Sequence, residues 1–502
     1  MTKTKSTFSP QTIALQGWLR PELTPVKANV DYSRFKEDLD RISANLRDGW
    51  LEAMAIEHAL EDMPADAPQG ARARRAEWAV FALRAEVLRH LLGLPSFRAY
   101  SRMLAGSDLL TDFCGVRTLE GIKWTSKSTL ERASKLFDEA GLERLNRLLA
   151  ELVGNDDWSA TLGLEERVDA TVCLMDTTCL EANVHHPVDW LLLKDIGVTL
   201  LKAVGLIRRE GLVCRMPGGP EQAWRDLNRL CMEMTHSRRK KDAGKIRKRV
   251  LRKMKALTGR IAEHARRHRD RLVSEGASTR WTLREAANIV ARIDDRLALL
   301  PEAVRQAHER MIGGRPVDSR DKILSAHERE IEVIVRGKAG RETEFGNALF
   351  ISESSDGFIF DYKLYRRGAP ADAVKLTESL ERQQAFQIDQ PIEEVVGDRA
   401  FQTKATARAL EEAGIIDSNC PKDPAELKRR MEDPRFRQSQ KRRGSTEARI
   451  AILKNNGGGR VCRAKGFDNR ATAVGWGVLS HNLWWIARKI RERREEEESK
   501  AA

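Results

Sequence analysis

Two short apolar runs that lie far apart in the chain each end in an aspartate. The first runs from Ala170 to Asp176 and the second from Glu394 to Asp398. Runs of this length and β-branched content are typical of buried strands, so both aspartates are expected at strand ends. Open α/β sheets place their sites there, and a third acid, Glu447, follows in a helical segment. Clustered carboxylates are the ligands that Mg²⁺ prefers, and two such ions suit phosphoryl transfer on a nucleic acid.

The charge of the chain indicates a polyanionic partner. Its 502 residues, enough for about three domains, carry a net charge of +14. An excess of that size is typical of nucleic-acid-binding proteins, and a merely basic surface is the alternative. The seven cysteines form no C-x-x-C pair, which argues against a zinc ribbon and favours a reducing compartment. Neither a membrane-spanning run nor an apolar signal core occurs, so we expect a cytoplasmic, nucleoid-associated protein without membrane contact.

The N-terminal part is expected to be helical. Residues 1–74 are predicted as an arm followed by a helix, and residues 75–150 as a helical DNA-binding domain. Within the latter, Ser126 to Leu130 resembles the N-cap of a recognition-type helix, which makes Ser128 a candidate for DNA contact. A helix-turn-helix and an ordinary helical subdomain both fit this pattern.

Residues 165–490 are predicted as one sheet-forming domain with a basic helical insertion at about 190–330, before a charged tail over 491–502. Within 236–270 of this insertion, fifteen Lys and Arg stand against three Asp and Glu. A solvated helix face is one interpretation, and contact with phosphates is the one we favour. The candidates for that contact are Lys245, Arg249 and Arg252.

Strand patterns flank the insertion. A first strand is predicted over 168–177, and later ones over 331–336, 345–353, 358–365 and up to Gly397, with a hairpin turn at 354–357. Helices are predicted over 404–413, 446–453 and 471–497. This order predicts an α/β fold in which a small mixed sheet carries acids at its strand ends.

Three segments together resemble the DDE transposases of bacterial insertion sequences, which have a ribonuclease H-like catalytic core. The segment from Asp176 shows an acid, then Glu-x-Asn, then a Pro and an Asp, as in the first-acid segment of that family. The Gly-Asp-Arg-Ala-Phe stretch around Asp398 is similar to the second-acid segment. The spacing Arg443-x3-Glu447-x6-Lys454 matches the last three members of the Tyr-Arg-Glu-Lys signature.

The resemblance implies a catalytic, metal-binding triad of Asp176, Asp398 and Glu447 with Mg²⁺, for which Mn²⁺ substitutes. It further implies that Arg443 and Lys454 contact the DNA backbone beside Glu447. The fold it implies is a ribonuclease H-like mixed sheet with a large helical insertion, preceded by the helical DNA-binding region.

Two positions depart from the family pattern within the stretch 95–490 that the likeness covers. Gln440 stands at the signature tyrosine, which removes the aromatic side chain that would contact DNA there. Ala400 stands where glycine is common, a mild change wherever φ is negative. Neither departure removes a metal ligand.

The function implied by the resemblance is transposition. Such a protein binds the terminal inverted repeats of its element, cleaves the DNA strands and joins the 3′-hydroxyl to target DNA, as a homodimer on DNA. A related metal-dependent nuclease without strand joining is one alternative, and a catalytically silent, domesticated DNA-binding protein is another.

Residues beside these motifs have a structural and a functional interpretation. Glu181, Asn183 and Asp189 are candidates to orient the site or to hold substrate, and for Asp189 we favour capping of the helix that begins at Trp190. Trp484 and Trp485 either stack on a base or pack in the core, and their place in a long amphipathic helix favours the core.

Overall fold

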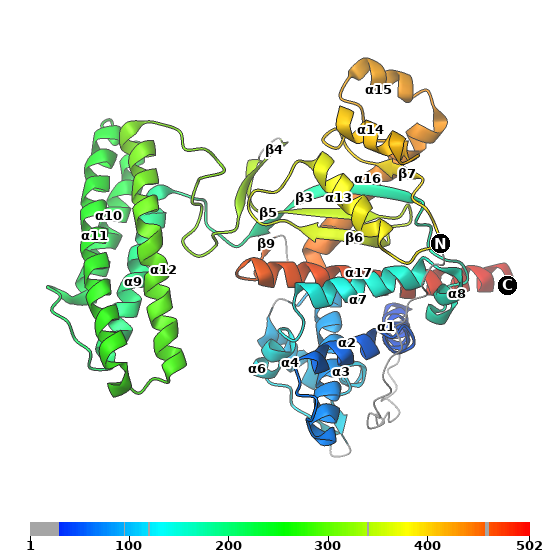
Figure 1. Ribbon diagram of the computed structural model, residues 1–502, viewed down its shortest axis with the longest axis horizontal. Helices are drawn as coiled ribbons and strands as arrows, with labels where there is room; N and C mark the ends of the chain where they lie inside the picture. Colours follow the sequence, from blue (N-terminus) through cyan, green and yellow to red (C-terminus); the bar gives the residue numbers. More distant parts are fainter. Residues whose placement is uncertain (1–29, 95, 119–120, 339–340, 457–460, 502) are drawn as a thin grey trace. The chain divides into compact units, whose positions relative to one another are not determined.

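The computed structural model describes residues 30–94, 96–118, 121–338, 341–456 and 461–501 (Figure 1). These residues form two compact units: one contains Met1–Asn183 with Gly346–Ala502, and the other contains Val184–Phe345. The predicted N-terminal arm within 1–29 lies outside the described residues. None of the described helices combines the length and the apolar character that a membrane span requires.

The N-terminal half of the first unit is helical, as its hydrophobic periodicity predicts. Its elements are α1 (Val30–Asp48), α2 (Leu51–Glu61), α3 (Gln69–Leu91), α4 (Phe97–Ala105), α5 (Asp108–Cys114), β1 (Arg117–Thr118), β2 (Gly121–Ile122), α6 (Lys127–Ala133), α7 (Glu139–Val153) and α8 (Asp156–Ser159). Helices α3 and α7 pack on α17 (Phe467–Ala501), the last helix of the chain. Leu83, Leu149 and Trp476 therefore belong to one hydrophobic core, and residues 75–150 share a compact unit with the sheet.

The sheet of this unit is mixed. Its strands are β3 (Val172–Ala182), β5 (Arg341–Glu353), β6 (Ile359–Leu364), β7 (Glu394–Val396), β8 (Ile416–Asp417) and β9 (Val461–Cys462). Their spatial order is β6-β5-β3-β7-β8. Pairing is antiparallel between β3 and β5 and between β5 and β6, and parallel between β3 and β7 and between β7 and β8. The short strand β9 adds a second parallel pair to the far end of β3.

The first strand differs from its prediction. It begins at Val172 and continues to Ala182, so Asp176 lies in mid-strand and not at the strand end. The reason is the partner strand: β5 pairs with β3 from Leu174 to Glu181, and this antiparallel ladder keeps the chain extended beyond the acid. The predicted hairpin between β5 and β6 is confirmed, since Ser354 N–H donates to Phe358 O over 2.8 Å.

Helices cover both faces of the sheet. Helices α13 (Asp372–Gln384), α16 (Pro434–Asn456) and α17 pack against its strands, and α14 (Lys404–Glu412) packs beside β8. Helix α15 (Pro424–Arg430) lies between β8 and α16 in the chain. Figure 1 shows α13 lying over β5 and β6, where Ser379 Oγ donates to Asp361 over 2.6 Å and Gln383 donates to Ser352 over 3.2 Å. Helix α16 crosses the opposite face.

The second unit is built from four long helices and β4 (Glu332–Lys338). The helices are α9 (Asp189–Arg209), α10 (Gly219–His236), α11 (Ala243–Glu275) and α12 (Leu283–His308), which share a leucine- and isoleucine-rich core. Asp189 does not cap α9: it is buried, and it accepts two hydrogen bonds of 2.8 Å from Arg310 and one from Gln306. This ion pair ties the start of α9 to the segment after α12.

Candidate active site

The pairing of β3 with β7 places Asp176 and Asp398 at equivalent positions along two neighbouring strands. Leu174 is paired with Val396 in this parallel pair, and each aspartate follows its paired residue by two positions. Because side chains alternate along a strand, Asp176 points to the same face as Leu174. Asp398 lies just beyond the end of β7, the strand next to the one that carries Asp176. Paired strands lie about 4.8 Å apart.

The backbone around Asp398 is closely packed. A Cβ placed on Gly397 would lie 2.5 Å from Asn419 Oδ1 and 2.8 Å from the ring of Phe401, so no other residue fits there. Phe401 is fully buried, and its ring lies 6.2 Å from that of Phe350 on β5. Asp398 itself is half-buried, and its carboxylate accepts a hydrogen bond of 2.7 Å from the backbone N–H of Ala400. The chain is therefore anchored on both sides of this acid.

Helix α16 crosses the sheet face that carries Asp176. At its start, Ser439 Oγ donates to Glu394 on β7 over 2.6 Å. Further along, Arg449 Nε donates to Glu353 on β5 over 3.0 Å. Glu394 is paired with Val172 and Glu353 with Leu174, so both acids share the face of Asp176. The helix that carries Glu447 thus spans β7, β3 and β5 above the first aspartate.

The three signature residues on α16 differ in exposure. Glu447 is exposed, whereas Arg443 and Lys454 are half-buried. The Nε atom of Arg443 is buried and has no hydrogen-bond partner among the described residues. Gln440, at the tyrosine position, donates to Ser418 O over 2.7 Å and so ties α16 to the segment after β8. This residue supports the fold of the site.

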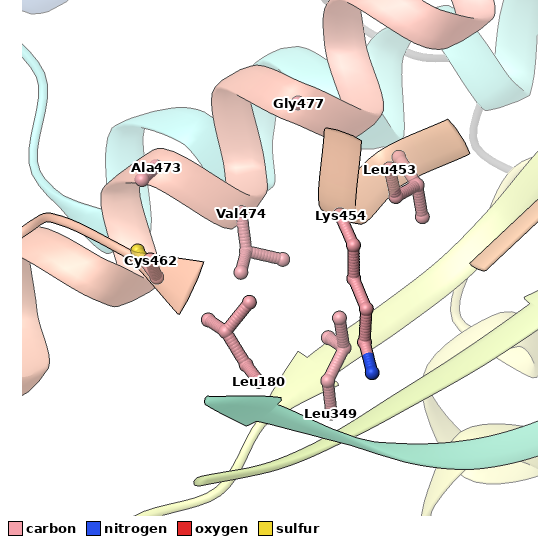
Figure 2. Close-up of a pocket in the computed structure, with 8 residues that line it drawn as sticks. All are labelled: Leu180, Leu349, Leu453, Lys454, Cys462, Ala473, Val474 and Gly477. Carbon is pink, nitrogen blue, oxygen red and sulfur yellow. The ribbon is translucent and has the colours of Figure 1, made fainter. Parts of the chain in front are cut away.

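Lys454, near the end of α16, borders a cavity that α17 also lines. It lines a cavity of about 30 Å³ together with Leu180, Leu349, Leu453, Cys462, Ala473, Val474 and Gly477 (Figure 2). Figure 2 shows its ammonium pointing past Leu349 toward the strands. Apart from Lys454, the residues that line the cavity are apolar or small.

A buried ion pair was not anticipated from the sequence. Glu353 is 1% exposed, and burial raises the pKa of its carboxyl above the usual value, against the opposing charge of Arg449. A Cβ on Gly357 would lie 1.8 Å from the guanidinium of Arg449, and Gly357 has φ +94°. Glycine therefore makes room in the β5–β6 turn for the arginine that ties α16 to the sheet.

The donor set fits a magnesium site in part. Among the described residues, no three His, Cys, Asp or Glu side chains are grouped closely enough to hold a metal ion. Asp176 in β3 and Asp398 just beyond β7 offer two carboxylates, the kind of group that Mg²⁺ prefers. Comparison with protein-family models, with curated proteins and with solved structures finds no match to this chain.

The other predicted DNA-contact residues are divided between the two units. Lys245, Arg249 and Arg252 are exposed at helical spacing on α11, although Arg249 also pairs with Glu233 over 2.7 Å. In the other unit, α6 begins at Lys127 with Ser126 as its N-cap. Ser128 is exposed, and its hydroxyl lies 2.9 Å from that of Ser126.

Proposed function

We propose that this chain is a DDE transposase that binds the terminal inverted repeats of its element, cleaves DNA and joins the freed 3′-hydroxyl to target DNA. The observation that carries the proposal is the position of Asp176 and Asp398, each two residues beyond a paired position in neighbouring parallel strands. The helix with Glu447 crosses the same face.

The strand order supports a ribonuclease H-like core. Counted along the chain from β3 and without β4 and β9, the strands lie in the order third, second, first, fourth, fifth. Each of the first three is antiparallel to its neighbour, and the last two are parallel to the first. These directions and this order are those of ribonuclease H-like sheets, and the helical second unit is inserted after the first strand.

The proposal assigns distinct tasks to the acids and the cations. Asp176 and Asp398 would hold Mg²⁺, with Glu447 as a third ligand in the DNA complex; bound Mg²⁺ ions activate the attacking oxygen and stabilise the leaving one. Water first hydrolyses a phosphodiester bond, and the freed 3′-hydroxyl then attacks the target strand, so that no residue becomes covalently attached to DNA. Arg443, Lys454 and the exposed cations of α11 would bind the backbone.

Two further parts of the proposal concern assembly and location. Joining two element ends requires that both be held together, which favours a homodimer on DNA. A DNA substrate and seven free cysteines are consistent with a reducing, nucleoid-associated location in the cytoplasm.

The test is a reaction with DNA from the two flanks of the protein's own coding sequence. End-labelled duplexes are incubated with the full chain and Mg²⁺ or Mn²⁺, and products are resolved on denaturing gels. Cleavage at fixed positions together with longer, joined products is the expected result. The matched control is Glu411→Gln, which removes an exposed acid from α14, away from the motif.

Three other outcomes overturn parts of the proposal. Cleavage without joined products identifies a nuclease. Specific binding without cleavage in either metal identifies a DNA-binding protein that lacks the reaction. Equal activity with a chain that carries Asp176→Asn and Asp398→Asn places the chemistry elsewhere.

A further inference from the structure

Trp124 is a tryptophan on the surface of the first unit. Its side chain is 60% exposed, while Trp476 and Trp485 in the same unit are buried in the core. Its indole offers a large flat apolar surface with a polar N–H, which suits contact with another molecule.

The backbone that carries Trp124 is fixed on both sides. Before it, Lys123 N–H donates to Val116 O over 2.9 Å at the base of the β1–β2 pair. After it, Ser101 on α4 donates its hydroxyl to the carbonyl of Thr125. The indole is therefore presented by a braced segment between β2 and α6, and little conformational entropy is lost when a ligand covers it.

Exposed cations flank Trp124 along the chain and are present on the helix to which its segment is tied. Lys123 and Lys127 flank it along the chain and are both exposed, although Lys127 also pairs with Glu131 over 2.9 Å. Arg98 and Arg102 are exposed on α4, the helix to which Ser101 ties the segment. An aromatic platform among Lys and Arg side chains is the combination that binds single-stranded nucleic acid, because bases stack on the ring while cations contact phosphates.

We infer that this surface binds unpaired nucleotides of DNA, with the indole of Trp124 stacked on a base. A duplex is excluded as the ligand of the ring because its base faces are covered by stacking within the helix. A second copy of the chain is a poorer fit, since the centres of protein interfaces are depleted of charged residues. The inference goes beyond the proposed reaction and requires no cleavage.

The test is fluorescence anisotropy with a short fluorescein-labelled oligothymidylate and the full chain. Trp124→Ala removes the indole ring and with it the stacking of one base. Binding should therefore weaken about 5- to 150-fold. Trp124→Phe keeps a ring and should retain most of the affinity. The matched control is Trp224→Ala: this tryptophan is 45% exposed on α10 of the second unit, and its loss should leave the affinity unchanged.

The salt dependence of oligonucleotide affinity distinguishes the contribution of base stacking from that of phosphate contacts. Trp124→Ala should leave the slope of log affinity against log salt unchanged, whereas Lys123→Ala should flatten it by about 0.7 if that lysine contacts a phosphate. The measurement requires no cleavage, so a failure of the proposed reaction leaves this test intact.

Two outcomes overturn the inference. One is equal oligonucleotide affinity for folded Trp124→Ala, Trp124→Phe and the unaltered chain. The other is loss of dimers in light scattering with Trp124→Ala at unchanged affinity, which assigns the surface to a second copy. Thermal unfolding of each variant, expected to match the unaltered chain because the indole is exposed, establishes that the comparison is between folded proteins.

Discussion

Arg449 on α16 donates a hydrogen bond of 3.0 Å to Glu353 on β5, and the side chain of Glu353 is completely shielded from water. This pair attaches the helix that carries Glu447 to the strand that neighbours Asp176. Removal of one partner of a buried ion pair leaves an uncompensated charge, which is far more costly than the loss of a surface pair.

Arg449→Ala should therefore lower the free energy of unfolding by about 3–5 kcal/mol, as measured by urea denaturation. The matched control is Arg408→Ala, which breaks a pair with Glu412 whose members are 81% and 62% exposed. Because water screens that pair, its loss should cost less than about 1 kcal/mol. Equal losses in the two variants would show that the buried pair has no special role.

The same pair predicts a pH dependence. Burial raises the pKa of Glu353, so the folded state binds a proton more readily than the unfolded chain, in which a Glu titrates near about 4.3. A raised carboxyl pKa lowers stability as pH rises from the unfolded value through the folded one. In Arg449→Ala this decline should steepen, and acidification toward about pH 4 should recover part of the lost stability.

The control for the pH effect is the double variant Arg449→Ala with Glu353→Gln, which has no carboxyl to titrate. Its stability loss relative to Glu353→Gln should be the same at both ends of this pH range. If the single and double variants respond to pH alike, Glu353 is not the group responsible.

Two glycines on α17 make a matched stability test. A Cβ on Gly477 meets no atom within 4 Å, and this residue lines the small cavity beside Lys454. Gly477→Ala should therefore stabilise the protein by about 1 kcal/mol, the usual gain for alanine over glycine within a helix. Thermal unfolding measures this change.

Gly475, two positions earlier, provides the opposite case. A Cβ there would lie 2.8 Å from Tyr362 Oη and 2.9 Å from Leu142 Cβ, both in the core. Gly475→Ala should lower stability by about 1–3 kcal/mol through overpacking, in spite of the better helix propensity of alanine. A stabilised Gly475→Ala would mean that α17 can shift away from α7.

Local sequence patterns predicted where strands, turns and helices lie better than they predicted which of these elements pair or pack together. The turn between β5 and β6 follows from Ser354 to Gly357, because glycine at φ +94° ends a strand at low cost. The extension of β3 beyond Asp176 depends on β5, which pairs with it from more than 150 positions away. Nor does the sequence bring Glu353 together with Arg449, which lie 96 positions apart.

For the helices too, the sequence predicted some of the elements but not the contacts between them. Helix α13 was not predicted, and the helix expected over 446–453 begins earlier, at Pro434, because Ser439 and Gln440 are held against the sheet. The apolar stripes of 75–150 were recognised as helical, but periodicity does not reveal that they pack on α17. Tests of end recognition therefore need the full chain, since this region shares its core with the C-terminal helix.

The basic face of α11 makes a prediction about affinity. The triple variant Lys245→Ala, Arg249→Ala, Arg252→Ala should weaken binding to any duplex and flatten its salt dependence by about 0.9 for each lost phosphate contact. Filter binding over a range of salt concentrations measures the slope.

The matched control for this face removes three exposed arginines from α12, as Arg284→Ala, Arg292→Ala and Arg305→Ala. It changes the total charge equally and should alter the slope less. Identical slopes in the two triple variants would indicate that the charge of α11 is a solvated face.

The triad makes the sharpest prediction. Asp176→Asn, Asp398→Asn and Glu447→Gln should each keep DNA binding and abolish cleavage, as measured with end-labelled duplexes. Each change removes one negative charge and nearly preserves shape, and two divalent cations in close proximity need those charges to coexist. The cations of α11 lie in the other unit, so their contacts with DNA should survive.

Glu447 differs from the two aspartates in a way that the metal can reveal. It is exposed on α16, whereas Asp176 and Asp398 are half-buried beside paired strand positions. Because Mn²⁺ tolerates a distorted ligand set better than Mg²⁺, it should restore weak cleavage to Glu447→Gln and none to Asp176→Asn or Asp398→Asn. Full Mg²⁺-dependent cleavage by Glu447→Gln would mean that Glu447 is only a surface acid next to Arg443, and that the third ligand lies elsewhere.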